Sequence, residues 1–191
     1  MLTGAPGAAI IYSILGLVLW PRENPLSTRP NLYLLSRWSE NGTIARIIWA
    51  IVWCGTSLLE LESPNFAPNA VSTELHTAGL NQPGWLHWLD LEASKLTSGI
   101  GPDVAFVLLL AEFLTGWLIL RKSTRNIAIV LGIVISIIFW LSGQGVGYLL
   151  TGEATDPNLG PAIVLFALAV IANIRSYSVV APNTYTANTL T

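Results

Sequence analysis

The chain has 191 residues, of which 52% are hydrophobic and only 10% are charged, whereas a typical soluble domain is about 25% charged. A soluble protein of this size could not cover its surface with so few charges, so the composition predicts an all-α, polytopic membrane protein. The absence of a basic extramembrane face excludes nucleic-acid binding. Cys54 is the only cysteine, which excludes an intrachain disulfide framework or a metal cluster built from thiolates.

Five apolar stretches are predicted to be membrane-crossing helices. In chain order they are residues 7–20, 43–61, 102–120, 126–150 and 161–174. A helix rises 1.5 Å per residue, so the third and fourth stretches are long enough to cross about 30 Å of hydrocarbon, and the second is just long enough. The first and last have shorter apolar cores, and by length alone they could also be re-entrant or interfacial.

The distribution of basic residues favours five crossings with the N-terminus outside. In that arrangement eight basic residues lie inside, namely Arg22, Arg29, Arg37, Arg46, Arg121, Lys122, Arg125 and Arg175, and only Lys95 lies outside. This asymmetry is the one that the positive-inside rule requires. The acidic residues independently gather on the outer side. The sequence therefore predicts a multi-pass protein of the cell membrane, with a flexible cytoplasmic tail over residues 176–191.

The outer segment between the second and third crossings, residues 62–101, is predicted to form two short surface helices. The first carries Val71, Leu75 and Ala78 on one face. The second carries an apolar face that includes tryptophan, with Trp85, Trp88, Leu89 and Leu96. Amphipathic helices with tryptophan on the apolar face lie in the plane of the membrane interface. We therefore expect both helices to cap the outer side of the bundle.

A weak internal repeat links the two ends of the chain. The opening LTGAPGAAIIYSILGLVLWPR, at residues 2–22, resembles LTGEATDPNLGPAIVLFALAVIANIR, which starts at Leu150. In both copies LTG precedes a Gly/Pro loop, an apolar helix and an arginine. The similarity is either chance or a duplication. In the second case residues 43–175 form one four-helix unit, and residues 1–22 are an extra helix left from a preceding unit whose beginning is absent.

Glu112 is the main candidate for a functional residue, because it lies halfway along the third predicted crossing. Insertion of an acidic side chain at that depth costs about 3 kcal/mol. We therefore expect Glu112 to face the bundle interior and to be protonated or paired. It could serve as a proton relay or bind a polar head group, such as that of a quinone. The alternative is a structural hydrogen bond to a neighbouring helix.

Gln144, in the motif SGQGVG near the end of the fourth predicted crossing, is the second candidate. The flanking glycines Gly143, Gly145 and Gly147 would allow another backbone to approach closely, or would break the helix and leave carbonyls that need a cavity. Gln144 could therefore share a polar site with Glu112, or the motif could mark a tight helix crossing.

The remaining charged residues have simpler interpretations. Arg46 lies near the inner end of its helix and is predicted to anchor the chain at the interface by snorkelling. Glu60 and Glu62 lie at the outer end and are expected to be solvated. His76 and His87 make no recognised pattern of metal ligands, so no metal site is predicted.

Residues 44–174 resemble a DoxX-type unit, a small four-helix membrane bundle with an extracytoplasmic insert after its first helix. The resemblance is carried by Arg46 at the start of the unit, by AEFLTGWLILRKSTR, and by WLSGQGVGYLLTGEATDPNLGPA before the closing helix. In that family an acidic residue commonly precedes a glycine by about four positions in the second helix, as Glu112 precedes Gly116. The chain is more similar to DoxX-like proteins of uncharacterised function than to the thiosulfate:quinone oxidoreductase subunits.

The resemblance implies a subunit or accessory of a membrane redox system rather than a stand-alone enzyme. Glu112 and Gln144 would line an interhelical polar pocket, Gly116 would serve helix packing, and a quinone would be the implied ligand. The competing hypothesis is a non-catalytic component that assembles with another membrane subunit, or with a second copy, through the outer helices. A small transporter is a third hypothesis, less favoured because only one crossing carries a charge at mid-membrane depth.

Overall fold

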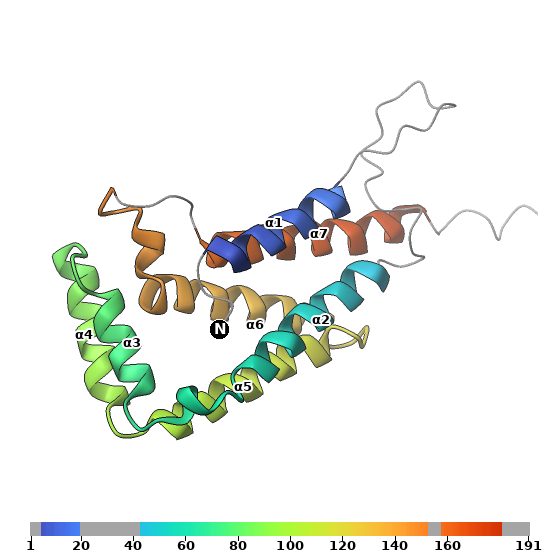
Figure 1. Cartoon of the computed structure of the whole chain (residues 1–191). Coiled ribbons are helices and arrows are strands. Elements are labelled where there is room, and N and C mark those ends of the chain that lie inside the picture. Colours follow the sequence, from blue (N-terminus) through green and yellow to red (C-terminus); the bar gives the residue numbers. More distant parts are fainter. Residues whose placement is uncertain (1–4, 20–42, 153–157, 181–191) are drawn as a thin grey trace, which may run out of the picture.

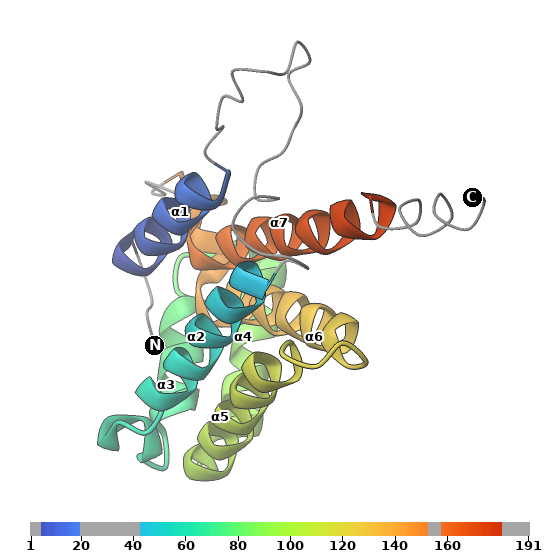
Figure 2. The same cartoon turned by 90° about the vertical axis from the view of Figure 1, so that its right-hand side faces the viewer.

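The computed structural model describes residues 5–19, 43–152 and 158–180, and all regular elements in these ranges are helical (Figures 1 and 2). The predicted all-α class is therefore confirmed for this part of the chain. The elements, in order, are α1 (Ala5–Leu19), α2 (Thr43–Leu59), the 3-10 turn η2 (Ser63–Phe66), α3 (Ala70–Ala78), α4 (Gly84–Thr97), α5 (Gly101–Leu118), α6 (Arg125–Ile138), the π-helical turn η3 (Phe139–Gly143), the turn η4 (Gly145–Tyr148) and α7 (Leu159–Val180).

Two segments are long and apolar enough to cross a membrane, judged by length and composition: Gly101–Leu118 with 18 residues and Arg125–Gly143 with 19. Thr43–Leu59 and Leu159–Ala172 are shorter apolar helices. The two longer segments expose large apolar side chains, such as Phe106 and Leu110 on α5 and Val130 on α6. Each of these helices thus has an apolar face that the described residues leave uncovered, which is weakly consistent with a membrane location.

The helices pack in a chain of neighbours, with α2 against α5, α5 against α6, α6 against α7, and α1 against α7. Trp49 is fully buried at the centre of this bundle. Its ring centroid lies 5.8 Å from that of Trp53 and 5.6 Å from that of Phe166, and its indole N–H donates to the Thr115 carbonyl at 3.2 Å. A Cβ on Gly132 of α6 would lie 2.4 Å from the Trp49 ring, so this glycine makes room for it.

Helices α2 and α5 cross at Gly116. A Cβ built on this residue would lie 2.6 Å from Cys54 Sγ and 3.0 Å from the Ala50 carbonyl oxygen. Both atoms belong to α2, so the two helices meet at a distance that only glycine allows. The same face of α5 carries Glu112, one turn earlier.

Helices α3 and α4 form an antiparallel hairpin that lies across one end of the bundle (Figure 1). The sequence predicted two helices here, and the structure contains both. The face of α4 that is buried carries Leu86 and Asp90, which are both fully buried. Trp85 and Trp88 are exposed instead, so the tryptophan face points away from the rest of the protein. We refer to α3 and α4 together as the α3–α4 hairpin.

The fourth predicted crossing, 126–150, is not one continuous α-helix. After Ile138 the chain makes the π-helical turn η3, in which the Gln144 N–H donates to the Phe139 carbonyl at 2.9 Å. Residues 145–148 then have φ angles of +51°, +54°, +62° and +58°, which is a left-handed turn. Left-handed helical geometry costs roughly 1–2 kcal/mol per L-residue, and β-branched Val146 is an uncommon residue to find in it.

Helix α7 continues to Val180, beyond the predicted end at residue 174 and into the predicted tail. The rest of that tail, 181–191, lies outside the described residues. The same is true of 20–42 and 153–157, which contain some of the basic and acidic residues used to predict the topology. The two helices that share the LTG repeat, α1 and α7, pack against each other. Ile11 and Leu15 of α1 belong to the same core as Ile163 of α7, so the extra helix is an integral part of the bundle.

Candidate functional site

Glu112 and Gln144 line one small cavity among α2, α5, η3 and α7. Its volume is about 40 Å³, and its wall also includes Trp53, Thr56 and Ser136. We call this cavity the bundle chamber. Glu112 and Gln144 are only 3% and 8% exposed. The structure thus brings together two polar residues that are 32 positions apart in the sequence, from different helices.

Four residues that line the bundle chamber each carry a buried polar atom without a hydrogen-bond partner. These atoms are Trp53 Nε1, Glu112 Oε2, Ser136 Oγ and Gln144 Oε1. Each such atom costs about 1–3 kcal/mol when it stays unpaired. About 10–15 Å³ of space open to the centre of a water molecule is enough to hold one, and that water needs two to four polar partners. The bundle chamber therefore has the size and chemistry to hold one water molecule or the polar end of a ligand.

The donors and acceptors of the bundle chamber are complementary in kind. Trp53 Nε1 can only donate and the Ser136 hydroxyl can do either, whereas the free oxygen of the Gln144 amide can only accept. The Thr56 hydroxyl donates to the Trp53 carbonyl at 2.9 Å and lies close enough to Glu112 to interact with it. The Thr56 hydroxyl can therefore donate either to the Trp53 carbonyl or to the Glu112 carboxyl.

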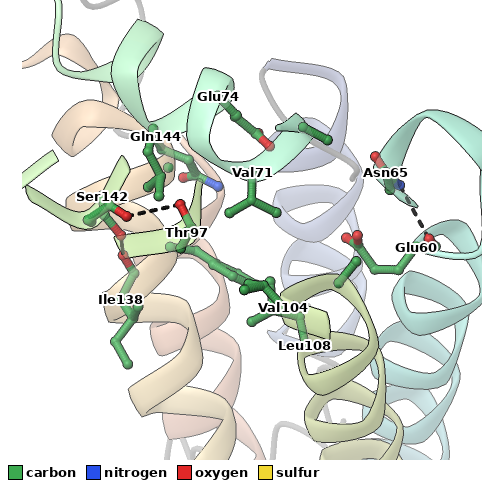
Figure 3. Close-up of a pocket in the computed structure, with 16 residues that line it drawn as sticks. Glu60, Asn65, Val71, Glu74, Thr97, Val104, Leu108, Ile138, Ser142 and Gln144 are labelled. Carbon is green, nitrogen blue, oxygen red and sulfur yellow. Dashed lines mark hydrogen bonds between the residues drawn. The ribbon is translucent and has the colours of Figure 1, made fainter. Parts of the chain in front are cut away.

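A second, larger cavity lies between the α3–α4 hairpin and the adjoining ends of α2, α5 and α6 (Figure 3). Its volume is about 350 Å³, and we call it the hairpin pocket. Phe139 and Gln144 line both cavities, so they form the wall between the bundle chamber and the hairpin pocket. The π-helical turn that ends α6 places both residues there.

Glu60 is buried in the hairpin pocket, so the prediction that it is solvated was wrong. Its side chain is 3% exposed, and Oε1 has no hydrogen-bond partner. The chain turns back into η2 directly after α2, and the Asn65 amide donates to the Leu59 and Glu60 carbonyls at 3.4 Å each. This turn aims the Glu60 carboxyl into the pocket (Figure 3). Glu62, two residues later, is exposed as expected.

Glu74 of α3 points into the same space from the opposite side, beside Val71 (Figure 3). Loss of solvent against the pocket walls raises the pKa of the Glu74 carboxyl above its ordinary value. The residues that line the hairpin pocket include no lysine, arginine or histidine. Among the described residues, the pocket therefore has acidic side chains in its lining and no basic ones.

The SGQGVG glycines lie in three different environments. A Cβ on Gly145 would lie 2.6 Å from Gln82 Nε2 and 2.9 Å from the Ala78 carbonyl oxygen, so this residue makes a close contact with the α3–α4 hairpin. Gly147 has a φ of +62°, in the left-handed region that favours glycine. A Cβ on Gly143 would meet nothing within 4 Å, so Gly143 makes no close helix contact.

Other predicted residues lie away from both cavities. Arg46 is half-buried near the start of α2, where its Nη2 donates to the Thr43 hydroxyl at 3.1 Å. His87 Nδ1 lies 2.9 Å from the Gly79 carbonyl oxygen, a contact within the hairpin. Among the described residues, no three His, Cys, Asp or Glu side chains are grouped so that they could hold a metal ion.

Sequence reasoning missed Trp53, Ser136 and Glu74. Trp53 and Ser136 stand in apolar runs of the sequence, where one polar atom does not mark a residue as functional. Their position in the chamber depends on which helix faces pack together.

Comparison of the chain with protein-family models, with curated proteins and with solved structures finds no match. Functional inference therefore depends on the two cavities.

Proposed function

We propose that the chain is a multi-pass protein of the cell membrane with about five crossings, the N-terminus outside and the C-terminus in the cytoplasm. The exposed apolar faces of α5 and α6 support a bilayer environment. The charges of the described loops support the orientation, since Arg121 and Lys122 follow α5 at the end remote from the α3–α4 hairpin, while Glu62 and Glu74 lie at the hairpin end.

We further propose that the protein binds the polar end of a lipid-soluble molecule in the bundle chamber, as a subunit or accessory of a membrane redox system. The observation that carries this proposal is that four residues around a void of about 40 Å³ each carry a buried polar atom without a hydrogen-bond partner. The resemblance of residues 44–174 to DoxX-type units makes a quinone the ligand class to test. The void has room for one quinone oxygen and the ring atoms next to it, so the rest of the quinone ring would lie at the edge of the bundle chamber.

Both redox forms of a quinone suit this arrangement. The carbonyl oxygen of the oxidised form would accept a hydrogen bond from Trp53 Nε1 or Ser136 Oγ. The hydroxyl group of the reduced form would donate to Glu112 or to Gln144 Oε1. Partners of both kinds within one chamber are what a protein needs if it is to hold the ligand before and after reduction.

The test compares two serines of the same helical segment. Decylubiquinone is titrated calorimetrically into the protein in lipid nanodiscs, with empty nanodiscs as the blank. Ser136→Ala removes one chamber hydrogen bond, worth about 1 kcal/mol, and should weaken binding about fivefold. Ser142→Ala is the matched control, since its hydroxyl donates to the Ile138 carbonyl at 2.7 Å outside the chamber, and binding should not change. Failure of the wild type to bind, or equal binding by Ser136→Ala, would contradict the proposal.

A structural role in a membrane complex is the second candidate, and the exposed side chains of Trp85, Trp88 and Leu96 on α4 favour it. In that case Trp88→Ser should release the protein from its complex on native gels while leaving quinone binding intact. Loss of quinone binding from the bundle-chamber variants, with the complex preserved, would favour the ligand-binding function instead.

A further inference from the structure

The hairpin pocket collects negative charge in a buried place. Glu60 contributes a carboxyl that is almost fully buried, with an unpartnered oxygen, and Glu74, an exposed residue of α3, contributes a second carboxyl that lines the same pocket. The two groups lie close enough for their charges to interact. A buried carboxylate such as that of Glu60 is strongly unfavourable unless it is paired, and the more exposed Glu74 carboxyl repels it. A cation between them would remove both costs.

The other polar groups of the hairpin pocket offer acceptors rather than donors. The Thr97 hydroxyl donates to the Ala93 carbonyl at 2.9 Å, and the Ser142 hydroxyl donates to the Ile138 carbonyl at 2.7 Å. The Asn65 amide nitrogen is engaged with backbone carbonyls at the end of α2. Gln144 presents a buried amide oxygen that has no partner. With these protons already engaged, the pocket suits a ligand that donates hydrogen bonds.

The rest of the wall is apolar and excludes a bare metal ion as the natural occupant. Val71, Leu75, Val104 and Leu108 line the pocket, and a hard metal ion would need six or more oxygen ligands around it. The volume of about 350 Å³ lies within the range of small-molecule sites, about 300–1,000 Å³. The pocket can therefore hold an apolar body as well as a charged group.

We propose that the hairpin pocket binds a small organic cation, with its ammonium group between Glu60 and Glu74 and its apolar body against Val104 and Leu108 of α5. Gln144 closes the pocket towards the bundle chamber. This site shares Phe139 and Gln144 with the bundle chamber, but its carboxyl groups belong to other residues, and the proposed cation binding does not depend on the proposed quinone binding. It would give the protein a ligand of a different chemical class at the end of the bundle where the hairpin lies.

The experiment compares two probes of nearly the same shape and different charge. Calorimetry measures binding of 4-phenylbutylammonium and of 4-phenylbutan-1-ol to the protein in phosphatidylcholine nanodiscs, whose net-neutral lipid does not concentrate the cation. The ammonium should bind at least about tenfold more tightly than the alcohol, as expected for one desolvated charge pair. Glu60→Gln and Glu74→Gln should each weaken ammonium binding by about fivefold or more and leave alcohol binding unchanged.

The matched control is Asp103→Asn. Asp103 is an exposed acidic residue next to Val104, at the end of α5 that lines the pocket, but Asp103 itself does not line it. This variant should bind the ammonium as the wild type does. Equal binding of the two probes, or equal loss in Asp103→Asn and Glu60→Gln, would overturn the proposed charge recognition. If neither probe binds, the pocket is not a site for this ligand class. If Glu60→Gln is misfolded, it will also fail to bind the alcohol. Ammonium binding by Glu74→Gln, whose substitution lies on another helix, then tests the proposed charge recognition.

Discussion

Gly116 sets the distance between α2 and α5, and through it the position of Glu112 one turn away. Gly116→Ala would place a Cβ 2.6 Å from Cys54 Sγ and 2.9 Å from the Cys54 backbone nitrogen. Since the backbone cannot yield easily, we expect destabilisation by about 1–3 kcal/mol, measured by unfolding in mixed detergent micelles. Gly55→Ala on α2 is the control, because a Cβ there meets nothing within 4 Å. Equal stability of the two variants would contradict the close contact.

Asp90 makes the stability of the α3–α4 hairpin depend on pH. It is fully buried, and neither carboxylate oxygen has a partner. Burial raises the pKa of Asp90 to about 6 from an ordinary value of 3.8, although the charge of nearby His87 lowers it. The folded state therefore holds the proton more tightly than the unfolded state. The stabilisation is complete below the ordinary pKa of 3.8 and is lost as the pH rises through about 6.

Asp90→Asn should remove this dependence, because the amide stays neutral. We expect the wild type to have a lower melting temperature at pH 7 than at pH 4, and the variant to show a smaller difference. The variant should also be more stable than the wild type at pH 7, by an amount on the order of 1 kcal/mol. Glu74, whose pKa is also raised, accounts for any dependence that the variant keeps. An unchanged pH profile in Asp90→Asn would contradict the buried, unpartnered carboxyl.

At the residue scale, the sequence was informative where a residue type conflicted with its surroundings. A carboxylate in the middle of an apolar run identified Glu112, and an amide among glycines identified Gln144. The same logic failed for Glu60, because an acidic residue at a helix end is usually solvated, and only the turn into η2 buries this one. Trp53 and Ser136 gave no conflict, since an indole or a hydroxyl is common in a membrane helix.

At the element scale, the left-handed turn over residues 145–148 brings the chain against the α3–α4 hairpin directly after Gln144. Gly145→Ala should destabilise the protein by about 1–3 kcal/mol, because the residue has φ of +51° and a Cβ would lie 2.6 Å from Gln82 Nε2. Gly143→Ala, two positions earlier, should have little effect, since its Cβ meets nothing within 4 Å. Thermal unfolding of both variants in the same detergent distinguishes them, and a reversed order would contradict the turn.

The helices themselves were largely predictable, because apolar length identified the regions of α2, α5 and α6, and amphipathic patterns identified α3 and α4. The end of α6 was not predictable in the same way. Glycines signalled a possible break, but not that Val146 and Tyr148 would also take positive φ, next to a Gly145 that contacts the hairpin. The buried face of α4 was also not predicted. The apolar tryptophan face was expected to pack, whereas the face that carries Leu86 and Asp90 is the one that is buried.

At the scale of the whole molecule, the α3–α4 hairpin closes one end of a helical bundle and forms one wall of the hairpin pocket (Figures 1 and 3). The bundle chamber lies among the helices on the other side of Phe139 and Gln144. Composition and charge predicted the helical class and an orientation, but neither cavity follows from them. Both cavities depend on which helix faces meet, and a single sequence does not encode that in any local pattern.

The central claim, a bundle that spans the membrane with the hairpin on its outer face, is tested most directly by chemical labelling. In a Cys54→Ala background, Lys95→Cys places a thiol on the hairpin and Lys122→Cys places one in the turn after α5, both at exposed positions. A membrane-impermeant maleimide should label Lys95→Cys in intact cells, and Lys122→Cys only after permeabilisation. Labelling of both positions from outside, or of Lys122→Cys alone, would contradict the proposed arrangement.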